Sequence, residues 1–186
     1  MMALVFACAA CSGAPDAGNE NARGDPANAI AANHAEASPN MPDAPIGVSN
    51  SATIGGDGSE IRLDPLAPVD LADASLPGEL GCTFSSPGLS PGVFVPLLVA
   101  KGNVASRDAA IGIVKVAGYV ERVAAPGGFD AMAKGTSFSG KGKTIGIALT
   151  GPATGGGESP SRPATLIYDR ADGAKRSFAG TWQCGP

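Results

Sequence analysis

The segment GTSFSGKGKT has the glycine and lysine spacing of a phosphate-binding loop. Gly135, Gly140 and Lys141 stand at that spacing, and Asp169 ends the apolar run TLIYD, as a magnesium-binding residue would. A phosphate loop must lead into a helix, because the helix N-terminus supplies the amides that hold the phosphates. Here the loop is followed by TIGIALTGP, which alternates like a strand, and Gly142 replaces the hydroxyl residue after Lys141. We therefore interpret the segment as a solvated loop and expect no cofactor.

Residues able to transfer protons near neutral pH are scarce. The only histidine is His34, and the C-terminal part of the chain has none, so it cannot assemble a Ser-His-Asp or Cys-His site. Its carboxylates are scattered, and only a pair such as Glu121 with Asp169 would suggest glycosidase chemistry. We expect lysines at strand surfaces and turns to be solvated, with Lys141 and Lys143 as weak candidates for an anion contact. The sequence thus predicts a protein that is not an enzyme.

Four cysteines indicate an oxidising compartment. Cys82 and Cys184 stand near the two ends of the C-terminal region, far from Cys8 and Cys11. A disulfide between Cys82 and Cys184 would close a loop of roughly 100 residues, worth about 4 to 5 kcal/mol in the chain-entropy account. A zinc site needs more ligands than this pair offers, so no metal is expected.

The apolar run MALVFACAA has the length and the small final residues of a secretory signal and is too short to span a bilayer as a helix. It resembles the signal of bacterial lipoproteins, because Ala9, Ala10 and Cys11 match the last three positions of their lipidation motif. The resemblance implies that residues 1–11 are a signal and lipidation segment. It also implies that Cys11 carries the lipid and anchors the protein in the cell envelope, facing the periplasm. A plain secretory signal, and hence a secreted protein, is the alternative.

Residues 12–77 are predicted to form a disordered linker. They are rich in Ala, Pro and Asn and show no sustained apolar period, so they bury too little surface to offset their chain entropy. From Ser12 to Leu76 two arginines face ten acidic residues, a net charge of −8, whereas the rest of the chain carries +4. That positive charge is too dispersed to predict nucleic-acid binding. Within the linker, SEIRLDPLAPVDL is a candidate edge strand.

Residues 78–186 are predicted to form a disulfide-linked β-domain. Apolar residues alternate in TIGIAL, in FAGTWQC and in CTF, which places both half-cystines and Trp182 on core-facing positions. GIVKVAGYVERV indicates two strands that turn at Ala117-Gly118, and Asp172-Gly173 indicates a hairpin. Further short strands are expected around Phe129 and Phe138. The fold class is therefore all-β, a small antiparallel barrel or sandwich of about eight short strands behind a disordered N-terminal tail.

Two functions are compatible with this organisation. The first is a non-catalytic binding or structural module, attached to a membrane through a lipid anchor, whose partner is an envelope protein or the wall polymer. The second is an inhibitor of a periplasmic hydrolase such as lysozyme. For the second, the domain is loosely similar to the lysozyme-inhibitor lipoproteins, in the segments VKVAGYVERV and FAGTWQC. That similarity implies a small disulfide-linked β-barrel behind a lipoprotein signal.

Overall fold

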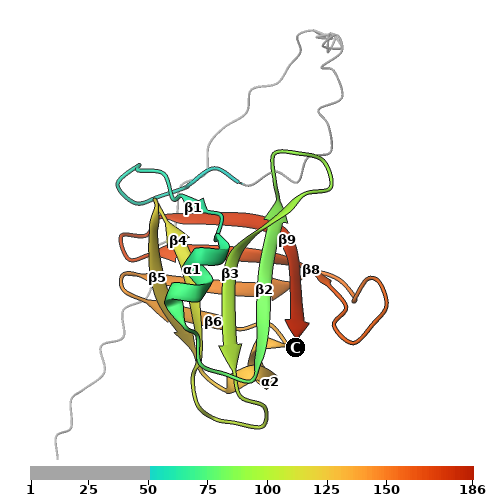
Figure 1. Cartoon of the computed structure of the whole chain (residues 1–186). Helices are drawn as coiled ribbons and strands as arrows, with labels where there is room; N and C mark the ends of the chain where they lie inside the picture. The colour runs from blue at the N-terminus through green and yellow to red at the C-terminus, as the bar shows by residue number, and fades with distance from the viewer. Residues whose placement is uncertain (1–50) are drawn as a thin grey trace, which may run out of the picture. The chain divides into compact units, whose positions relative to one another are not determined.

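The computed structural model describes residues 51–186, which form nine strands and two short helices (Figure 1). The helices are α1 (Pro68–Ala74) and α2 (Gly128–Met132). The strands are β1 (Leu63–Asp64), β2 (Leu80–Pro87), β3 (Phe94–Gly102), β4 (Ala110–Val116), β5 (Tyr119–Ala125), β6 (Ser137–Gly140), β7 (Lys143–Leu149), β8 (Arg162–Arg170) and β9 (Lys175–Gly185).

Eight of these strands form a closed antiparallel barrel. Their order is β4-β3-β2-β9-β8-β7-β6-β5, and a further pairing of β4 with β5 closes the sheet on itself. The short strand β1 pairs with the end of β4, where Leu63 stands opposite Val116. Closure pairs the strand edges that an open sheet would expose. The predicted all-β class is confirmed. Of the two predicted architectures, a barrel and a sandwich, the structure has the barrel.

The barrel interior follows the alternating pattern of the sequence. Ile145 on β7 and Phe84 on β2 are fully buried, and Phe178 and Trp182 on β9 are almost fully buried. The Trp182 ring meets the Phe138 ring edge-on, with the ring centroids 6.5 Å apart, and its indole Nε1 donates to the Met132 carbonyl oxygen at 2.9 Å. The expectation that Trp182 belongs to the core is confirmed.

The two ends of the barrel differ in their connections. The links β2–β3, β4–β5, β6–β7 and β8–β9 all lie at one end, which we call the hairpin rim. The predicted turns at Ala117-Gly118 and Asp172-Gly173 are both found there, with positive φ at Ala117, Gly118 and Gly173. The phosphate-loop-like segment is the β6–β7 hairpin. A strand follows its lysines, as the sequence indicated.

A disulfide joins β2 to β9. Cys82 stands directly opposite Cys184 in the strand register, with sulfur atoms 2.10 Å and Cα atoms 4.0 Å apart. The two residues are 102 positions apart in sequence, and all strands from β3 to β8 lie between them. The pairing is the one that the positions of the cysteines predicted.

The linker predicted for residues 12–77 ends earlier than expected. Residues 12–50 lie outside the described residues, but residues 51–77 contain β1 and α1 and belong to the barrel. Leu66 and Ala74 are buried with Ile113, on the outer face of β4, so α1 covers part of the barrel wall. The Asp70 carboxylate accepts a hydrogen bond from the Ala67 amide, which begins the helix, and pairs with Lys115 at 3.0 Å. Tertiary contacts therefore order a segment whose own periodicity is weak.

One predicted strand is a helix. The run around Phe129 forms α2, which begins after Gly127, a residue with a φ of 85°. The helix lies at the end opposite the hairpin rim, where Met132 is fully buried. A short apolar run of this length is compatible with either a strand or a helix. The glycines before it turn the chain at the end of the barrel, and the run then continues as a helix.

Candidate functional site

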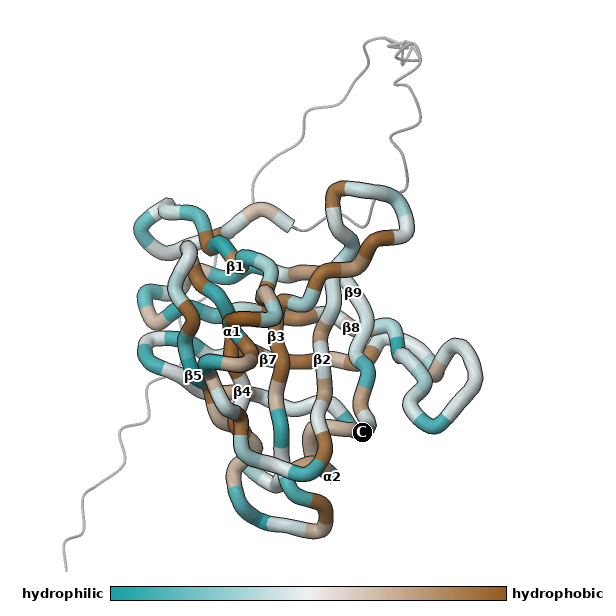
Figure 2. The backbone as a smooth tube through the Cα atoms, in the orientation of Figure 1, coloured by the Kyte–Doolittle hydropathy of each residue, from teal (hydrophilic) through white to brown (hydrophobic). Residues whose placement is uncertain are grey.

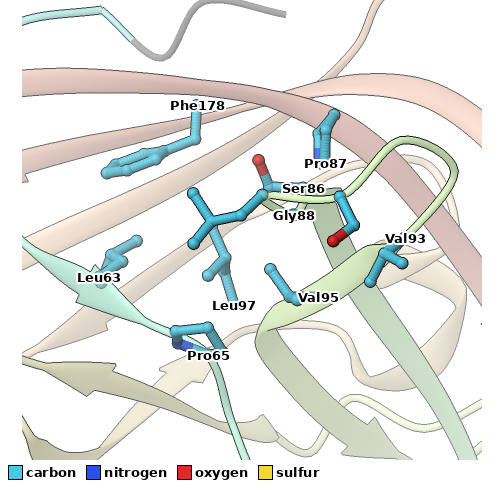
Figure 3. A pocket seen from close by; sticks show the side chains of 11 residues that line it. Leu63, Pro65, Ser86, Pro87, Gly88, Val93, Val95, Leu97 and Phe178 are labelled. Atoms are coloured by element: carbon cyan, nitrogen blue, oxygen red, sulfur yellow. The ribbon is translucent and has the colours of Figure 1, made fainter.

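An open apolar pocket of about 480 Å³ lies at the hairpin rim. Its walls come from β1, from the β2–β3 hairpin and from β9. The apolar side chains around it include Leu63, Val93, Val95, Leu97 and Phe178 (Figure 3). No lining residue carries a charge. Its volume falls within the usual range of about 300 to 1,000 Å³ for ligand sites.

The pocket exists because the β2–β3 hairpin leaves the barrel wall. Pairing of β2 with β9 stops at Ser85, whereas pairing of β2 with β3 continues to Pro87, so the last part of the hairpin projects from the rim (Figure 1). A register shift between Phe84 and Ser85, where β3 has the extra residue Leu97, marks the point where the hairpin departs from the wall. The buried Ser86 hydroxyl donates to the Ala179 carbonyl oxygen at 3.1 Å and so fixes the hairpin to β9.

Arg176 holds the segment before β1 in place beside the pocket. Its guanidinium donates to the backbone carbonyl of Ser51 at 3.0 Å and to that of Ile61, and pairs with Glu60 at 3.0 Å. It also lies over the Phe178 ring, with Cζ 5.0 Å from the ring centroid. This side chain, together with the backbone bonds of Ser51 and Ile54 to β9, connects residues 51–61 to the β9 wall. The pairing of Leu63 with Val116 then places β1 beside the pocket. No motif of the sequence indicated a role for Arg176 or a pocket at this end of the barrel.

Lys141 and Lys143 differ in their surroundings. Lys141 is exposed in the β6–β7 turn, but the Lys143 side chain points into the barrel and is only 4% exposed. There it forms an ion pair with Glu121 and donates to the Lys141 carbonyl oxygen at 3.0 Å. The expectation that Lys143 is solvated is wrong, because Lys143 shares the inward face of β7 with Ile145.

The carboxylates considered for catalysis do not form a pair. Glu121 faces the barrel interior and bonds to Lys143, whereas Asp169 pairs with Lys175 at 3.1 Å on the outer side of β8. Asp172 accepts hydrogen bonds from Arg170, and this contact, with the amide of Ala174, holds the pKa of the Asp172 carboxyl well below its usual range. These acidic groups are therefore committed to structural contacts rather than to a common site.

Tyr168 gives the barrel a measurable pH response. Burial, helped by the nearby charge of Glu121, raises the pKa of Tyr168 from 10.0 to about 12. Because the folded pKa lies above the unfolded one, the stabilising contribution is complete below pH 10 and is lost as the pH rises toward 12. We expect ultraviolet titration of a Tyr119→Phe variant, which keeps Tyr168 as its one tyrosine, to show ionisation near pH 12. A Tyr168→Phe variant should lack that step, and a midpoint near 10 in the folded Tyr119→Phe protein would contradict the burial.

Other kinds of site find no support within residues 51–186. No helix there is long and apolar enough to cross a membrane. No three His, Cys, Asp or Glu side chains of that region come together as a metal site requires. Cys11, the predicted lipidation site, and His34 lie outside the described residues.

Comparison with known proteins gave no match to a family model, to a curated protein or to a solved structure.

Proposed function

We propose that this chain is a non-catalytic binding module of the cell envelope, attached to a membrane through Cys11, and that it binds an apolar group of its partner in the pocket at the hairpin rim. The observation that carries the proposal is the pocket itself, a concave surface without a charged lining residue, open to solvent. Its one buried hydroxyl, on Ser86, already donates to Ala179, so the walls favour apolar contacts over hydrogen bonds to a ligand.

The apolar lining of the pocket distinguishes between the two partners expected from the sequence, an envelope protein and the wall polymer. A wall polymer offers mainly hydroxyl and amide groups, which lose hydrogen bonds with water when they enter an apolar pocket. The pocket therefore favours the apolar group of an envelope component over the wall polymer.

The alternative function, inhibition of a hydrolase such as lysozyme, has less support. The projecting hairpin has the shape to enter a cleft, but glycosidase clefts carry a pair of carboxyl groups. From Leu80 to Ala100 the chain contains no charged residue, so the hairpin offers those carboxyl groups no cation. The hairpin and a glycosidase cleft therefore lack the electrostatic complementarity that favours specific association.

The pocket is tested with N-phenyl-1-naphthylamine, an uncharged probe whose fluorescence rises in apolar surroundings. We expect saturable binding of about one probe per chain. Val93→Asp should weaken binding at least tenfold, on the order expected when a charge faces a bound apolar group. Val93 is 49% exposed, so this variant should fold.

Val104→Asp is the matched control, because Val104 is 47% exposed and follows β3 at the opposite end of the barrel. It should bind the probe as the unmodified chain does. Equal binding by both variants, or no saturable binding at all, would refute the pocket as the binding site.

A further inference from the structure

Exposed apolar side chains gather at the hairpin rim. Among residues 51–186, eight large hydrophobic residues are exposed, and six of them belong to this end of the barrel: Ile54, Leu89, Val93, Phe94, Tyr119 and Val120. Leu89, in the β2–β3 connection, is as exposed as a side chain can be, at 108%, and Tyr119 is 76% exposed. Single exposed hydrophobic residues are ordinary, but their concentration at one end marks an interaction surface. Figure 2 shows the projecting hairpin with apolar segments on both of its arms.

Most charged side chains at this rim are bound to one another, and Lys141, exposed in the β6–β7 turn, has no ion pair within the described part of the chain. Arg170 pairs with Asp57 at 2.6 Å and with Asp172 at 2.7 Å, and Arg62 pairs with Asp64 at 3.2 Å. The β2–β3 hairpin adds no charge of either sign. One unpaired cation is not the cluster that attracts anionic lipids, and the paired charges oppose contact with an apolar phase less than isolated charges would.

Three separate segments supply the exposed residues, and this favours a lipid surface over a protein partner. A stable protein interface needs about 800 Å² of matching surface on each side. A bilayer instead accepts isolated apolar side chains that project to different extents, and it places amphipathic rings such as that of Tyr119 at the headgroup level. The projecting hairpin and the neighbouring β4–β5 turn fit the second description.

The path of the chain points to the same end. Ser51, the first described residue, bonds to Ser177 of β9 in its half next to the hairpin rim, with Ser51 N donating to Ser177 O at 3.0 Å. Cys11 precedes it by 40 residues in the sequence. An anchor at Cys11 would keep the rim near lipid at a high local concentration, so a weak intrinsic affinity would suffice.

We infer that the hairpin rim docks on a lipid surface, with Leu89 and Val93 entering the acyl region and an acyl chain occupying the pocket behind them. The inference rests on the proposed function, because it identifies the apolar group that the pocket takes. Contact of the rim with lipid would add to the membrane affinity that the proposed anchor at Cys11 supplies.

The test measures sedimentation of the full chain, carrying Cys11→Ser to remove the anchor, with vesicles of phosphatidylcholine alone or mixed with phosphatidylglycerol. We expect binding to both compositions, because the rim contributes apolar contacts rather than cations. Leu89→Asp should lower the partition coefficient at least tenfold, on the order expected for losing one buried leucine. Val69→Asp is the matched control, since Val69 is 60% exposed but belongs to α1 on the barrel wall.

A second measurement places the hairpin directly. In a Leu89→Trp variant the tryptophan emission should shift to shorter wavelength when vesicles are added, whereas Val104→Trp should show no shift. Absence of vesicle binding, equal partition of the Leu89→Asp and Val69→Asp variants, or binding that requires phosphatidylglycerol would overturn the inference. Probe binding that Val93→Asp abolishes, without vesicle docking, would leave the proposed function standing and remove only the lipid partner.

Discussion

Replacing Cys82 and Cys184 together by alanine is expected to lower the free energy of unfolding by about 2 to 5 kcal/mol, the usual cost of removing a native disulfide from a small domain. The bond spans 102 residues and joins β2 to β9, the pairing with the largest sequence separation in the barrel wall. Without it, closing the barrel requires ordering every strand from β3 to β8 before the last contacts form. Urea unfolding followed by circular dichroism measures the effect.

Reduction provides the control for this prediction. Dithiothreitol should shift the urea midpoint of the unmodified chain by a similar amount and leave the double alanine variant unchanged. If the variant unfolds at the same urea concentration as the oxidised chain, the disulfide contributes nothing and the pairing of β2 with β9 is sufficient alone.

The strands were predictable from the sequence because a barrel wall has one buried face. Alternation at Ile145 and Ile147, and at Phe178 and Trp182, corresponds directly to residues that are at most 5% exposed. Closure was not predictable, because it depends on the pairing of β2 with β9, the first and last strands of the barrel, whose residues alternate in the same way in a sandwich. Alternation fixes which side chains point inward, and the register of distant strands fixes the architecture.

The errors have physical causes in particular residues. Lys143 stands two residues before Ile145, so its inward direction was implied by the period of the strand, but its partner Glu121 belongs to another hairpin. Residues 51–77 lack a period because they bury few side chains, such as Ile61, Leu66 and Ala74, against a wall that already exists. The pocket was not predictable either, because Leu63 and Phe178 are distant in sequence and both line it only once residues 51–64 are bound to β9 and β4.

Gly180 is the residue where the smallest substitution is expected to have the largest effect. It lies on β9 opposite the end of the β2–β9 pairing, where the Phe84 ring and the backbone of Ser85 occupy the space that a side chain would need. A Cβ at position 180 would overlap the Ser85 carbonyl oxygen and lie 2.8 Å from Cζ of Phe84. Phe84 is fully buried and the carbonyl belongs to the backbone, so neither neighbour can move without disturbing the β2–β9 seam.

We therefore expect Gly180→Ala to lower the free energy of unfolding by about 3 kcal/mol, at the upper end of the usual cost of overpacking a core. Gly146→Ala on β7 is the matched control, because a Cβ there meets nothing within 4 Å. That change should leave stability unaltered or raise it by a few tenths of a kcal/mol, since alanine loses less backbone entropy than glycine on folding. Thermal and urea unfolding of the two variants decide the question, and equal stability of both would mean that β2 does not approach β9 as closely as the barrel requires.

Because the same seam releases the β2–β3 hairpin at Ser85, Gly180→Ala should also weaken probe binding in the pocket, whereas Gly146→Ala should not.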